Sequence, residues 1–241
     1  PGTTSFKETL MRALFFFLFV LVSLPAAAAP CISIIGTGRV GSTLGPRFAA
    51  MGHDVIYGSR SADSPRVQEL VARTGDRARA TEPQAAAQAC ELVLFAVPWE
   101  AAEAAFKGLG ALDGKLIIDV TNPLDVREGR EIALPVPNSG AELLQSWAPG
   151  ARIVKAFNTV NYRVMENPAI AGGPVSVPLS GDDAAAKATV ATLVRGIGFD
   201  PVDVGPLRTA RYTENMALLY VSLLVRGGPF YEYYLRPRTG S

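Results

Sequence analysis

Three glycines stand at positions 36, 38 and 41, in the spacing G-x-G-x-x-G. They follow a short apolar segment, Cys31–Ile35, and precede a helical pattern over Val40–Met51. In such a loop Gly36 permits a tight turn, Gly38 lets the backbone approach a pyrophosphate, and Gly41 lets helix and strand pack closely. The unpaired N–H groups at the start of the helix would face the anion. The spacing and its context therefore predict a dinucleotide site.

The next apolar segment indicates which dinucleotide would bind. A strand that binds NAD normally ends in Asp or Glu, about 20 residues after the loop, to hold the ribose 2′-OH. Here the segment 53–57 runs into Gly58, Ser59 and Arg60, and Asp54 lies at its beginning, the wrong end for the ribose. Ser59 can donate a hydrogen bond to a 2′-phosphate, and Arg60 can form a charged pair with it. We interpret this as an NADP(H) site; the alternative is that both are solvated loop residues.

Composition argues against several other functions. The chain has 241 residues, 49% of them hydrophobic, which is enough for one α/β domain with a buried core. Its 23 basic and 22 acidic residues are scattered, so we expect no nucleic-acid partner. Two cysteines cannot build a zinc site, and no metal is expected. The single histidine, His53, lies between a helix and a strand, which disfavours mechanisms that need a histidine base.

The N-terminal segment 1–29 reads as an extension followed by a signal-like sequence. Pro1–Leu10 stands upstream of Met11 and resembles vector sequence or an extended reading frame. A basic residue, an apolar run over Ala13–Leu24 and small residues over 26–29 follow, as in a cleaved secretory signal. The apolar run is too short for a comfortable membrane span. We expect an exported, periplasmic protein; the alternative is an uncleaved extension on a cytoplasmic protein, where the reduced NADP pool lies.

Strands and helices alternate past residue 30, which predicts an α/β fold of the Rossmann type. We expect a doubly wound, mostly parallel sheet covered by helices on both faces. The expected strands are 31–35, 54–58, 77–80, 91–97, 115–120, 152–157, 175–180 and 201–204. The expected helices are 40–51, 64–74, 83–89, 100–109, 141–147, 183–197 and 209–225.

We divide the chain into three parts. Residues 1–29 are the extension with its signal-like segment, and residues 30–171 are the NADP-binding Rossmann domain. Residues 172–241 form a small C-terminal α/β lobe that would complete the pocket for a second cofactor or substrate. Gly172, Gly173 and Pro174 make the best candidate for a soft joint. The lobe is too short for the large helical domain of hydroxyacid dehydrogenases.

Five motifs in order resemble those of a known family. They are Ile35-Gly36-Thr37-Gly38, Gly58-Ser59-Arg60, Ala96-Val97-Pro98-Trp99-Glu100, Lys155-Ala156-Phe157-Asn158-Thr159 and Ser180-Gly181-Asp182-Asp183. Over about residues 31–215 the chain resembles the F420-dependent NADP oxidoreductases, whose NADP-binding domain is of the pyrroline-5-carboxylate reductase type. It also resembles the NADPH-binding domain of the STEAP-type metalloreductases.

This resemblance implies that NADPH binds beside a deazaflavin (F420) or flavin ring and that hydride passes between the two rings. Thr37, Gly38, Arg39 and Val40 would line the pyrophosphate, and Ser59 and Arg60 would bind the 2′-phosphate. Residues at three strand ends would border the nicotinamide and the second ring: Val97, Pro98, Trp99, Val120, Thr121, Asn122, Asn158 and Thr159. The positions of these residues at the ends of expected strands favour the same location, because ligands of open α/β sheets bind beyond the carboxyl ends of the strands.

Simpler roles stay open for several of these residues. Pro98 and Trp99 can be plain packing, Asn122 can belong to a turn with Pro123, and Asn158 can be a capping side chain. Lys155 stands within an apolar strand, so we expect its amine to reach the edge of the sheet, and we assign it no catalytic role.

The C-terminal stretch departs from the family because it is unusually aromatic, with Tyr212, Tyr220, Phe230, Tyr231, Tyr233 and Tyr234. The family uses the segment 207–215 for the second-cofactor pocket, which makes Arg208, Arg211 and Tyr212 candidates there. The tyrosine cluster can instead be a docking surface for a membrane or protein partner, or for a second subunit in a homodimer.

Three functions remain open. The first is hydride transfer between NADPH and a deazaflavin or flavin, which needs little acid–base help from the protein, so no catalytic side chain is assigned. The second is direct reduction of a small carbonyl or imine, for which Tyr212 and Lys155 are poor proton donors. The third is a non-enzymatic NADP(H)-binding module that senses redox state or docks to a partner.

Cys31 starts the first expected strand and Cys90 immediately precedes the fourth, and these two strands are neighbours in the usual strand order. If the protein is exported, Cys31 and Cys90 can form a disulfide. The alternative is a pair of buried free thiols, which are common in protein cores.

Overall fold

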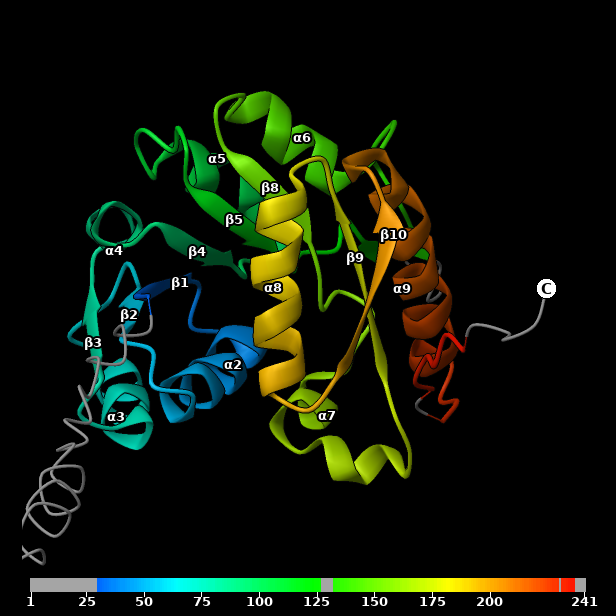
Figure 1. The fold of residues 1–241 in the computed structure, drawn as a ribbon, viewed down its shortest axis with the longest axis horizontal. Helices are drawn as coiled ribbons and strands as arrows, with labels where there is room; N and C mark the ends of the chain where they lie inside the picture. Colours follow the sequence, from blue (N-terminus) through cyan, green and yellow to red (C-terminus); the bar gives the residue numbers. More distant parts are fainter. Residues whose placement is uncertain (1–29, 127–131, 230, 237–241) are drawn as a thin grey trace, which may run out of the picture.

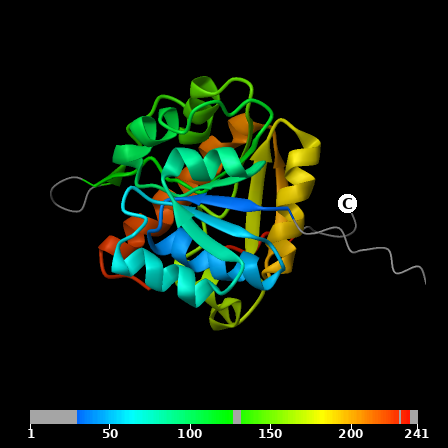
Figure 2. The same ribbon diagram turned by 90° about the vertical axis from the view of Figure 1, so that its left-hand side faces the viewer.

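The computed structural model describes residues 30–126, 132–229 and 231–236. The signal-like segment and Phe230 lie outside these ranges, so the expectations about them stay predictions. The described residues form three layers, with a twisted sheet between helices on both of its faces (Figures 1 and 2). This arrangement confirms the predicted doubly wound α/β fold.

The central sheet is mostly parallel, as predicted. Within the described residues it has eight strands in the order β10-β9-β8-β5-β4-β1-β2-β3. Of the neighbouring strands in this described sheet, only β8 and β9 run antiparallel, with Lys155 opposite Ser180. The strand bounds are β1 (Ile32–Ile35), β2 (Val55–Gly58), β3 (Ala78–Thr81), β4 (Leu92–Phe95), β5 (Leu116–Asp119), β8 (Arg152–Lys155), β9 (Ser176–Gly181) and β10 (Asp200–Gly205).

The parallel strands at the centre bring their carboxyl ends to one edge of the sheet. β1, β4, β5 and β8 pair in parallel, so the residues after Ile35, Phe95, Asp119 and Lys155 all lie along that edge. β1, β4 and β5 are short, largely apolar strands that are buried on both faces, as helix-covered parallel strands must be. The sheet therefore positions the loops that carry the predicted site.

Helices fill a separate apolar core on each face of the sheet. One core is covered by α2 (Arg39–Ala50), α3 (Pro65–Thr74), α7 (Tyr162–Glu166) and α8 (Ala184–Gly196). The other is covered by α4 (Pro83–Ala89), α5 (Ala102–Lys107) and α6 (Gly140–Trp147). Helix α9 (Ala210–Val225) packs against α6 and reaches the hairpin of β6 (Asp125–Val126) and β7 (Ile132–Ala133).

Short 3₁₀ turns connect several of these elements, namely η1 (Trp99–Ala101), η3 (Pro168–Ala171) and η4 (Leu207–Thr209). The predicted helix at 100–109 is thus split into η1 and α5. Helix α7 was not predicted, since five residues are too few to show a helical period. Its start is fixed locally, because the Asn161 side chain accepts a hydrogen bond from the backbone N–H of Arg163 at 2.9 Å.

The C-terminal segment continues the main sheet. β9 and β10 extend it beyond β8, and α8 packs on all three of these strands. Gly172 has a positive φ of 70°, as its place after η3 requires, and a domain boundary there stays a prediction. None of the described helices combines the length and the apolar character that crossing a membrane requires.

Candidate functional site

The three loop glycines have three different geometric roles. Gly36 has a φ of +103°, and a Cβ added to it would lie 2.4 Å from the carbonyl oxygen of Ala96. A Cβ on Gly41 would lie 2.0 Å from the carbonyl oxygen of Gly36, so α2 packs directly onto the loop. A Cβ on Gly38 would meet no described atom within 4 Å, although its φ of −75° suits any residue. Open space at Gly38 is what the approach of a pyrophosphate requires.

This loop lines a cavity of about 730 Å³ at the carboxyl edge of β1, β2 and β4. The cavity brings together Gly36, Thr37, Gly38, Ser59, Arg60, Val97 and Pro98 from the predicted set. Residues that were not predicted complete the wall, among them Ser61, Arg66, Glu82, Pro83 and Gln84. The two sequence motifs at the ends of β1 and β2 therefore face one space.

Arg60 is an available cation at the rim of this cavity. It is exposed, and no described residue forms a hydrogen bond or ion pair with its side chain. Ser59 is anchored beside it, because its backbone N–H donates to the Thr81 carbonyl oxygen at 2.9 Å. Asp54 lies at the opposite end of β2, where it pairs with Arg77 at 3.1 Å. The end of β2 thus presents a hydroxyl and a cation where an NAD site would have a carboxylate.

Arg66 is a site residue that was missed in the sequence. From the first turn of α3 it donates two hydrogen bonds to Thr37, at 2.8 Å to the carbonyl oxygen and 2.9 Å to Oγ1. It therefore fixes the dinucleotide loop and adds a second positive charge to the cavity wall. A basic residue in the first turn of the helix after Arg60 was the available signal.

Four predicted residues lie beside the cavity without lining it. The Arg39 guanidinium carbon is 5.5 Å from the centre of the Tyr162 ring, Val40 packs against the core, and Gly41 is buried under the loop. Trp99 stacks on Trp147, with ring centres 6.2 Å apart. The packing role that was open for Trp99 is thus present in the structure.

The remaining predicted residues meet at the ends of β5 and β8. Asn122 donates a hydrogen bond to the Asn158 carbonyl oxygen at 2.9 Å, and Asn158 returns one to Asn122 Oδ1 at 3.1 Å. Asn158 also donates to the carbonyl oxygen of Thr213, on α9, at 3.0 Å. Val120, Thr121 and Thr159 are buried next to this pair in the chain.

Two features at this edge are typical of ligand sites. Asn158 Oδ1 and Thr159 Oγ1 are buried without a hydrogen-bond partner among the described residues. Phe157 has a φ of +61°, which costs a non-glycine residue free energy. Unpaired buried atoms and local strain often occur where a ligand completes the structure.

A buried ionic triad lies beneath the same strand ends. Lys155 is fully buried and contacts Asp119 at 2.9 Å and Glu214 at 2.8 Å. Burial by itself lowers the pKa of Lys155, but the two carboxylates outweigh it and hold the pKa above its usual value. The expectation that the amine reaches the sheet edge is wrong, because both carboxylates and the Thr121 carbonyl oxygen hold it inside.

The candidates in the segment 207–215 differ in availability. Arg211 forms a two-pronged ion pair with Glu142, with N–O distances of 2.8 and 2.6 Å. The hydrogen bond from Arg211 lowers the pKa of the Glu142 carboxyl, although burial partly opposes it. Tyr212 is 70% exposed, and Arg208 is also exposed.

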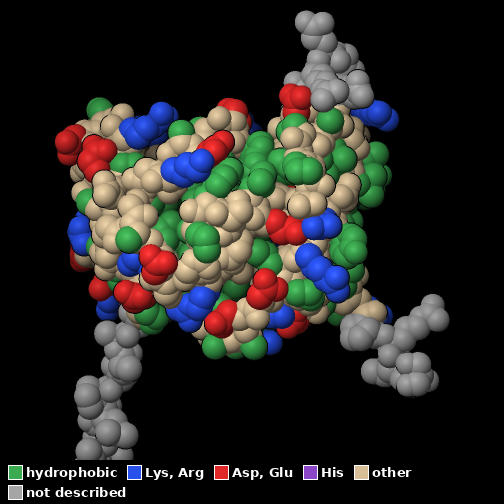
Figure 3. Space-filling model, turned by 90° about the horizontal axis from the view of Figure 1, so that it is seen from above, with side chains coloured by type: hydrophobic (Ala, Val, Ile, Leu, Met, Phe, Trp, Pro, Cys, Tyr) green, Lys and Arg blue, Asp and Glu red, His purple; other side chains and the backbone are tan. Residues whose placement is uncertain are grey.

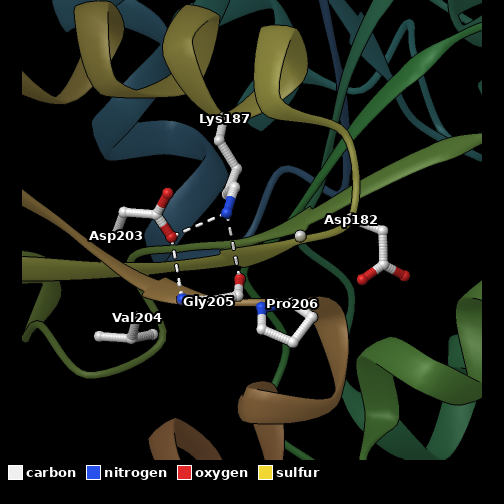
Figure 4. Close-up of a pocket in the computed structure, with 7 residues that line it drawn as sticks. Asp182, Lys187, Asp203, Val204, Gly205 and Pro206 are labelled. Atoms are coloured by element: carbon white, nitrogen blue, oxygen red, sulfur yellow. Dashed lines mark hydrogen bonds and ion pairs between the residues drawn. The ribbon is translucent and has the colours of Figure 1, made fainter.

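A second depression, of about 700 Å³, lies between the start of α8 and the end of β10 (Figure 4). Lys187 points into it but donates to Asp203 at 2.8 Å and to the Gly205 carbonyl oxygen at 3.2 Å. Asp182 accepts a hydrogen bond from the Leu207 backbone N–H. The charged side chains that line this depression are therefore already paired within the protein. The depression contains no residue of the predicted site.

Two further observations concern the distribution of charge and the side chains that could bind a metal. Acidic and basic side chains are interspersed over the described part of the face seen in Figure 3. In the described ranges, no group of His, Cys, Asp and Glu residues is arranged to hold a metal ion.

Cys31 and Cys90 form a disulfide at the amino edge of the sheet, with their Cα atoms 5.4 Å apart.

Comparison with known proteins gives a consistent result. The family model for "NADP oxidoreductase coenzyme F420-dependent" matches residues 31–123. The crystal structure of a proposed F420-dependent NADP reductase from Arthrobacter sp. FB24 is 34% identical in sequence. It covers 87% of this chain and 100% of its own, with a TM-score of 0.78.

Two curated proteins extend the comparison. The F420-dependent NADP reductase of Methanothermobacter marburgensis is 28% identical over 79% of this chain and 90% of its own length. Metalloreductase STEAP3 of Rattus norvegicus is 31% identical over 79% of this chain but only 37% of its own length. The chain thus spans about a third of the length of the metalloreductases that it matches.

Proposed function

Since this chain belongs to the family of F420-dependent NADP oxidoreductases, we propose that it transfers hydride between NADPH and the ring of a deazaflavin or flavin. One observation carries this proposal: the open backbone at Gly38 and the exposed residue Arg60 line the same cavity. That pair matches the two phosphate groups by which NADP(H) is held, the pyrophosphate and the 2′-phosphate.

The residues of the cavity suit this cofactor. Thr37 and Gly38 would face the pyrophosphate beside the N-terminus of α2, with Arg66 holding the loop in place. Ser59 and Arg60 would bind the 2′-phosphate. Val97 and Pro98 lead from the cavity toward the ends of β5 and β8, where Asn122, Asn158 and Thr159 lie in the order that the nicotinamide half would follow.

The reaction is balanced without a proton donor from the protein. NADPH supplies the hydride, and the acceptor ring takes it together with one proton from solvent, which gives NADP⁺ and the reduced ring. The protein's part is to align the two rings and to exclude water between them. This agrees with the residues that follow β5 and β8, which carry amide, hydroxyl and apolar side chains.

Direct reduction of a carbonyl or imine is less well supported. It needs a proton donor, and all three N–H groups of Lys155 are already held by Asp119, Glu214 and the Thr121 carbonyl oxygen. Tyr212 points outward from α9, with 70% of its surface exposed. Neither candidate from the sequence is placed to protonate a substrate.

Oxidation of NADPH, followed at 340 nm with purified protein, tests the proposal. We expect absorbance to fall only when F420, FMN or FAD is added, with one NADPH consumed per acceptor reduced under anaerobic conditions. Turnover with a small carbonyl or imine alone would favour the direct reductase. Tight NADPH binding without turnover by any acceptor would favour a non-enzymatic binding module.

Export is a separate proposal. It is supported by the signal-like pattern before residue 30 and by the disulfide between Cys31 and Cys90, since disulfides persist in oxidising compartments. Fractionation of the producing cells, with N-terminal sequencing of the protein, tests it. A protein found in the cytoplasm with its N-terminal segment intact would overturn it.

A further inference from the structure

We propose that Lys155 is a positioning residue that holds the ends of β5 and β8 in the geometry needed to bind the nicotinamide half of the cofactor. This inference rests on the proposed function and adds a role for a residue that touches neither ring. The structural basis is the triad of Lys155, Asp119 and Glu214.

The ammonium group of Lys155 ties three segments together. It donates to Asp119 Oδ2 at the end of β5, to the Thr121 carbonyl oxygen at 2.5 Å, and to Glu214 on α9. Asp119 Oδ1 in turn accepts from the backbone N–H and from the hydroxyl of Thr121, each at 2.8 Å. The turn after β5 is therefore fixed on both sides, by a donor to its carbonyl and by an acceptor for its amide.

Glu214, on α9, links Lys155 to the start of α6. Its carboxylate accepts from the backbone N–H groups of Gly140 and Ala141, at 3.0 and 3.3 Å, at the start of α6. Gly140 lies against the ring of Trp99, where a Cβ would approach that ring to 2.9 Å. Lys155 thus stands at the junction of both strand ends, α6 and α9.

Burial of this triad is costly, which argues for a specific role. Replacement of a buried ionic group by apolar side chains of similar size is often neutral or stabilising, so such groups are poor devices for stability alone. They do impose a single geometry, since each N–H must keep its acceptor. Here that geometry includes Thr121, which precedes the Asn122–Asn158 pair at the predicted nicotinamide edge.

A charge-balanced double variant separates positioning from folding. Lys155→Met with Glu214→Gln removes one positive and one negative charge, so the buried net charge is unchanged. The amide introduced by Glu214→Gln would keep an oxygen for the Gly140 N–H, and Asp119 would keep both bonds from Thr121. Lys187→Met is the matched control, because it breaks the Lys187–Asp203 ion pair in the second depression, outside the proposed site.

Two ligands distinguish binding of the adenosine half of the cofactor from binding of its nicotinamide half. Adenosine 2′,5′-bisphosphate carries the 2′-phosphate but no nicotinamide, whereas NADPH carries both and reports nicotinamide immobilisation through its fluorescence. We expect the double variant to bind the bisphosphate within about twofold of the wild type. Its preference for NADPH over the bisphosphate and its single-turnover hydride transfer should each fall at least about tenfold, since a shift of about 1 Å can cost on the order of a hundredfold.

A folded double variant that keeps the NADPH preference and the hydride-transfer rate would overturn the role of Lys155. Should the double variant not fold, the same measurements are made on Asp119→Asn. We expect this variant to lose a smaller part of its preference for NADPH over the bisphosphate. An unchanged NADPH preference would contradict the role of Lys155. A wild-type protein that neither prefers NADPH to the bisphosphate nor turns over with F420 or a flavin would instead refute the proposed function. Lys187→Met should match the wild type in every measurement.

Discussion

Gly41 lies so close to Gly36 that a Cβ on it would be 2.0 Å from the Gly36 carbonyl oxygen. The first turn of α2 is thus in direct backbone contact with the loop that follows β1. Gly38, between them in the sequence, has open space where its side chain would be. Two of the three glycines are therefore required by the fold itself, and the third is required only if a ligand occupies the space in front of it.

This contrast predicts opposite effects of alanine at two positions. Gly38→Ala should keep the melting temperature of the wild type but weaken NADPH binding by about tenfold or more, because the methyl group occupies the approach of the pyrophosphate. Gly41→Ala should lower the free energy of unfolding by about 1–3 kcal/mol through overpacking. Thermal unfolding and calorimetric titration with NADPH measure both. A Gly38→Ala protein with unchanged NADPH affinity would show that no pyrophosphate lies there.

Arg66 should affect all dinucleotides alike. Its two hydrogen bonds to Thr37 fix the loop rather than the adenosine ribose, so Arg66→Gln should weaken NADPH and NADH binding by similar factors. Loss of hydrogen bonds worth about 1 kcal/mol corresponds to roughly fivefold. Arg195→Gln, an exposed change on α8, is the control. A loss confined to NADPH would instead place Arg66 on the 2′-phosphate.

The disulfide should stabilise the fold from the edge opposite the ligand site. It closes a loop of 59 residues between Cys31 and Cys90, for which loop entropy gives about 4 kcal/mol. The double variant Cys31→Ser with Cys90→Ser should melt at a markedly lower temperature while its NADPH affinity stays unchanged. Thiol titration of the denatured, unreduced protein should find no free thiol, and two free thiols would disprove the bond.

Glu232 should make stability depend on pH. Its carboxylate oxygens are buried without a hydrogen-bond partner in the described structure. Burial raises the pKa of Glu232 from 4.5 to about 7. The folded protein then binds a proton that the unfolded chain has released, so stability falls as pH rises from about 4.5 to about 7.

The comparison with Glu232→Gln isolates that effect. The free energy of unfolding of the wild type, relative to the variant, should decline across this pH range by on the order of 1 kcal/mol, since the residue is only partly buried and solvent screens part of the effect. Denaturant titrations at several pH values measure it, with Glu69→Gln on the surface of α3 as control. A wild-type curve parallel to the variant's would show that the carboxyl titrates normally.

The sequence predicted those parts of the molecule that follow from local patterns. The apolar runs ending at Ile35, Phe95 and Asp119 are short strands buried on both faces, and their alternation with helices is enough to indicate a parallel sheet. The loop glycines were assigned because the G-x-G-x-x-G spacing between a strand and a helix by itself indicates a dinucleotide-binding loop.

Contacts between distant segments could not be predicted in the same way. Arg66 reaches Thr37 across 29 residues, and Lys155 meets Asp119 and Glu214 only after β5, β8 and α9 have packed together. A lysine and an aspartate in two apolar strands were a visible signal of a buried pair, but nothing local identified Glu214 as the third member. The antiparallel pairing of β9 with β8 likewise depends on how the chain returns to the sheet after η3.

The NADPH-to-NADH affinity ratio in the wild type and in Arg60→Ala tests the central claim most directly. The claim is that the end of β2 holds the 2′-phosphate. We expect the wild type to prefer NADPH and Arg60→Ala to lose affinity for NADPH by about 10- to 150-fold, the equivalent of ~1.5–3 kcal/mol for a charged hydrogen bond. NADH binding should stay nearly unchanged. An equal affinity ratio in the two proteins would contradict the account.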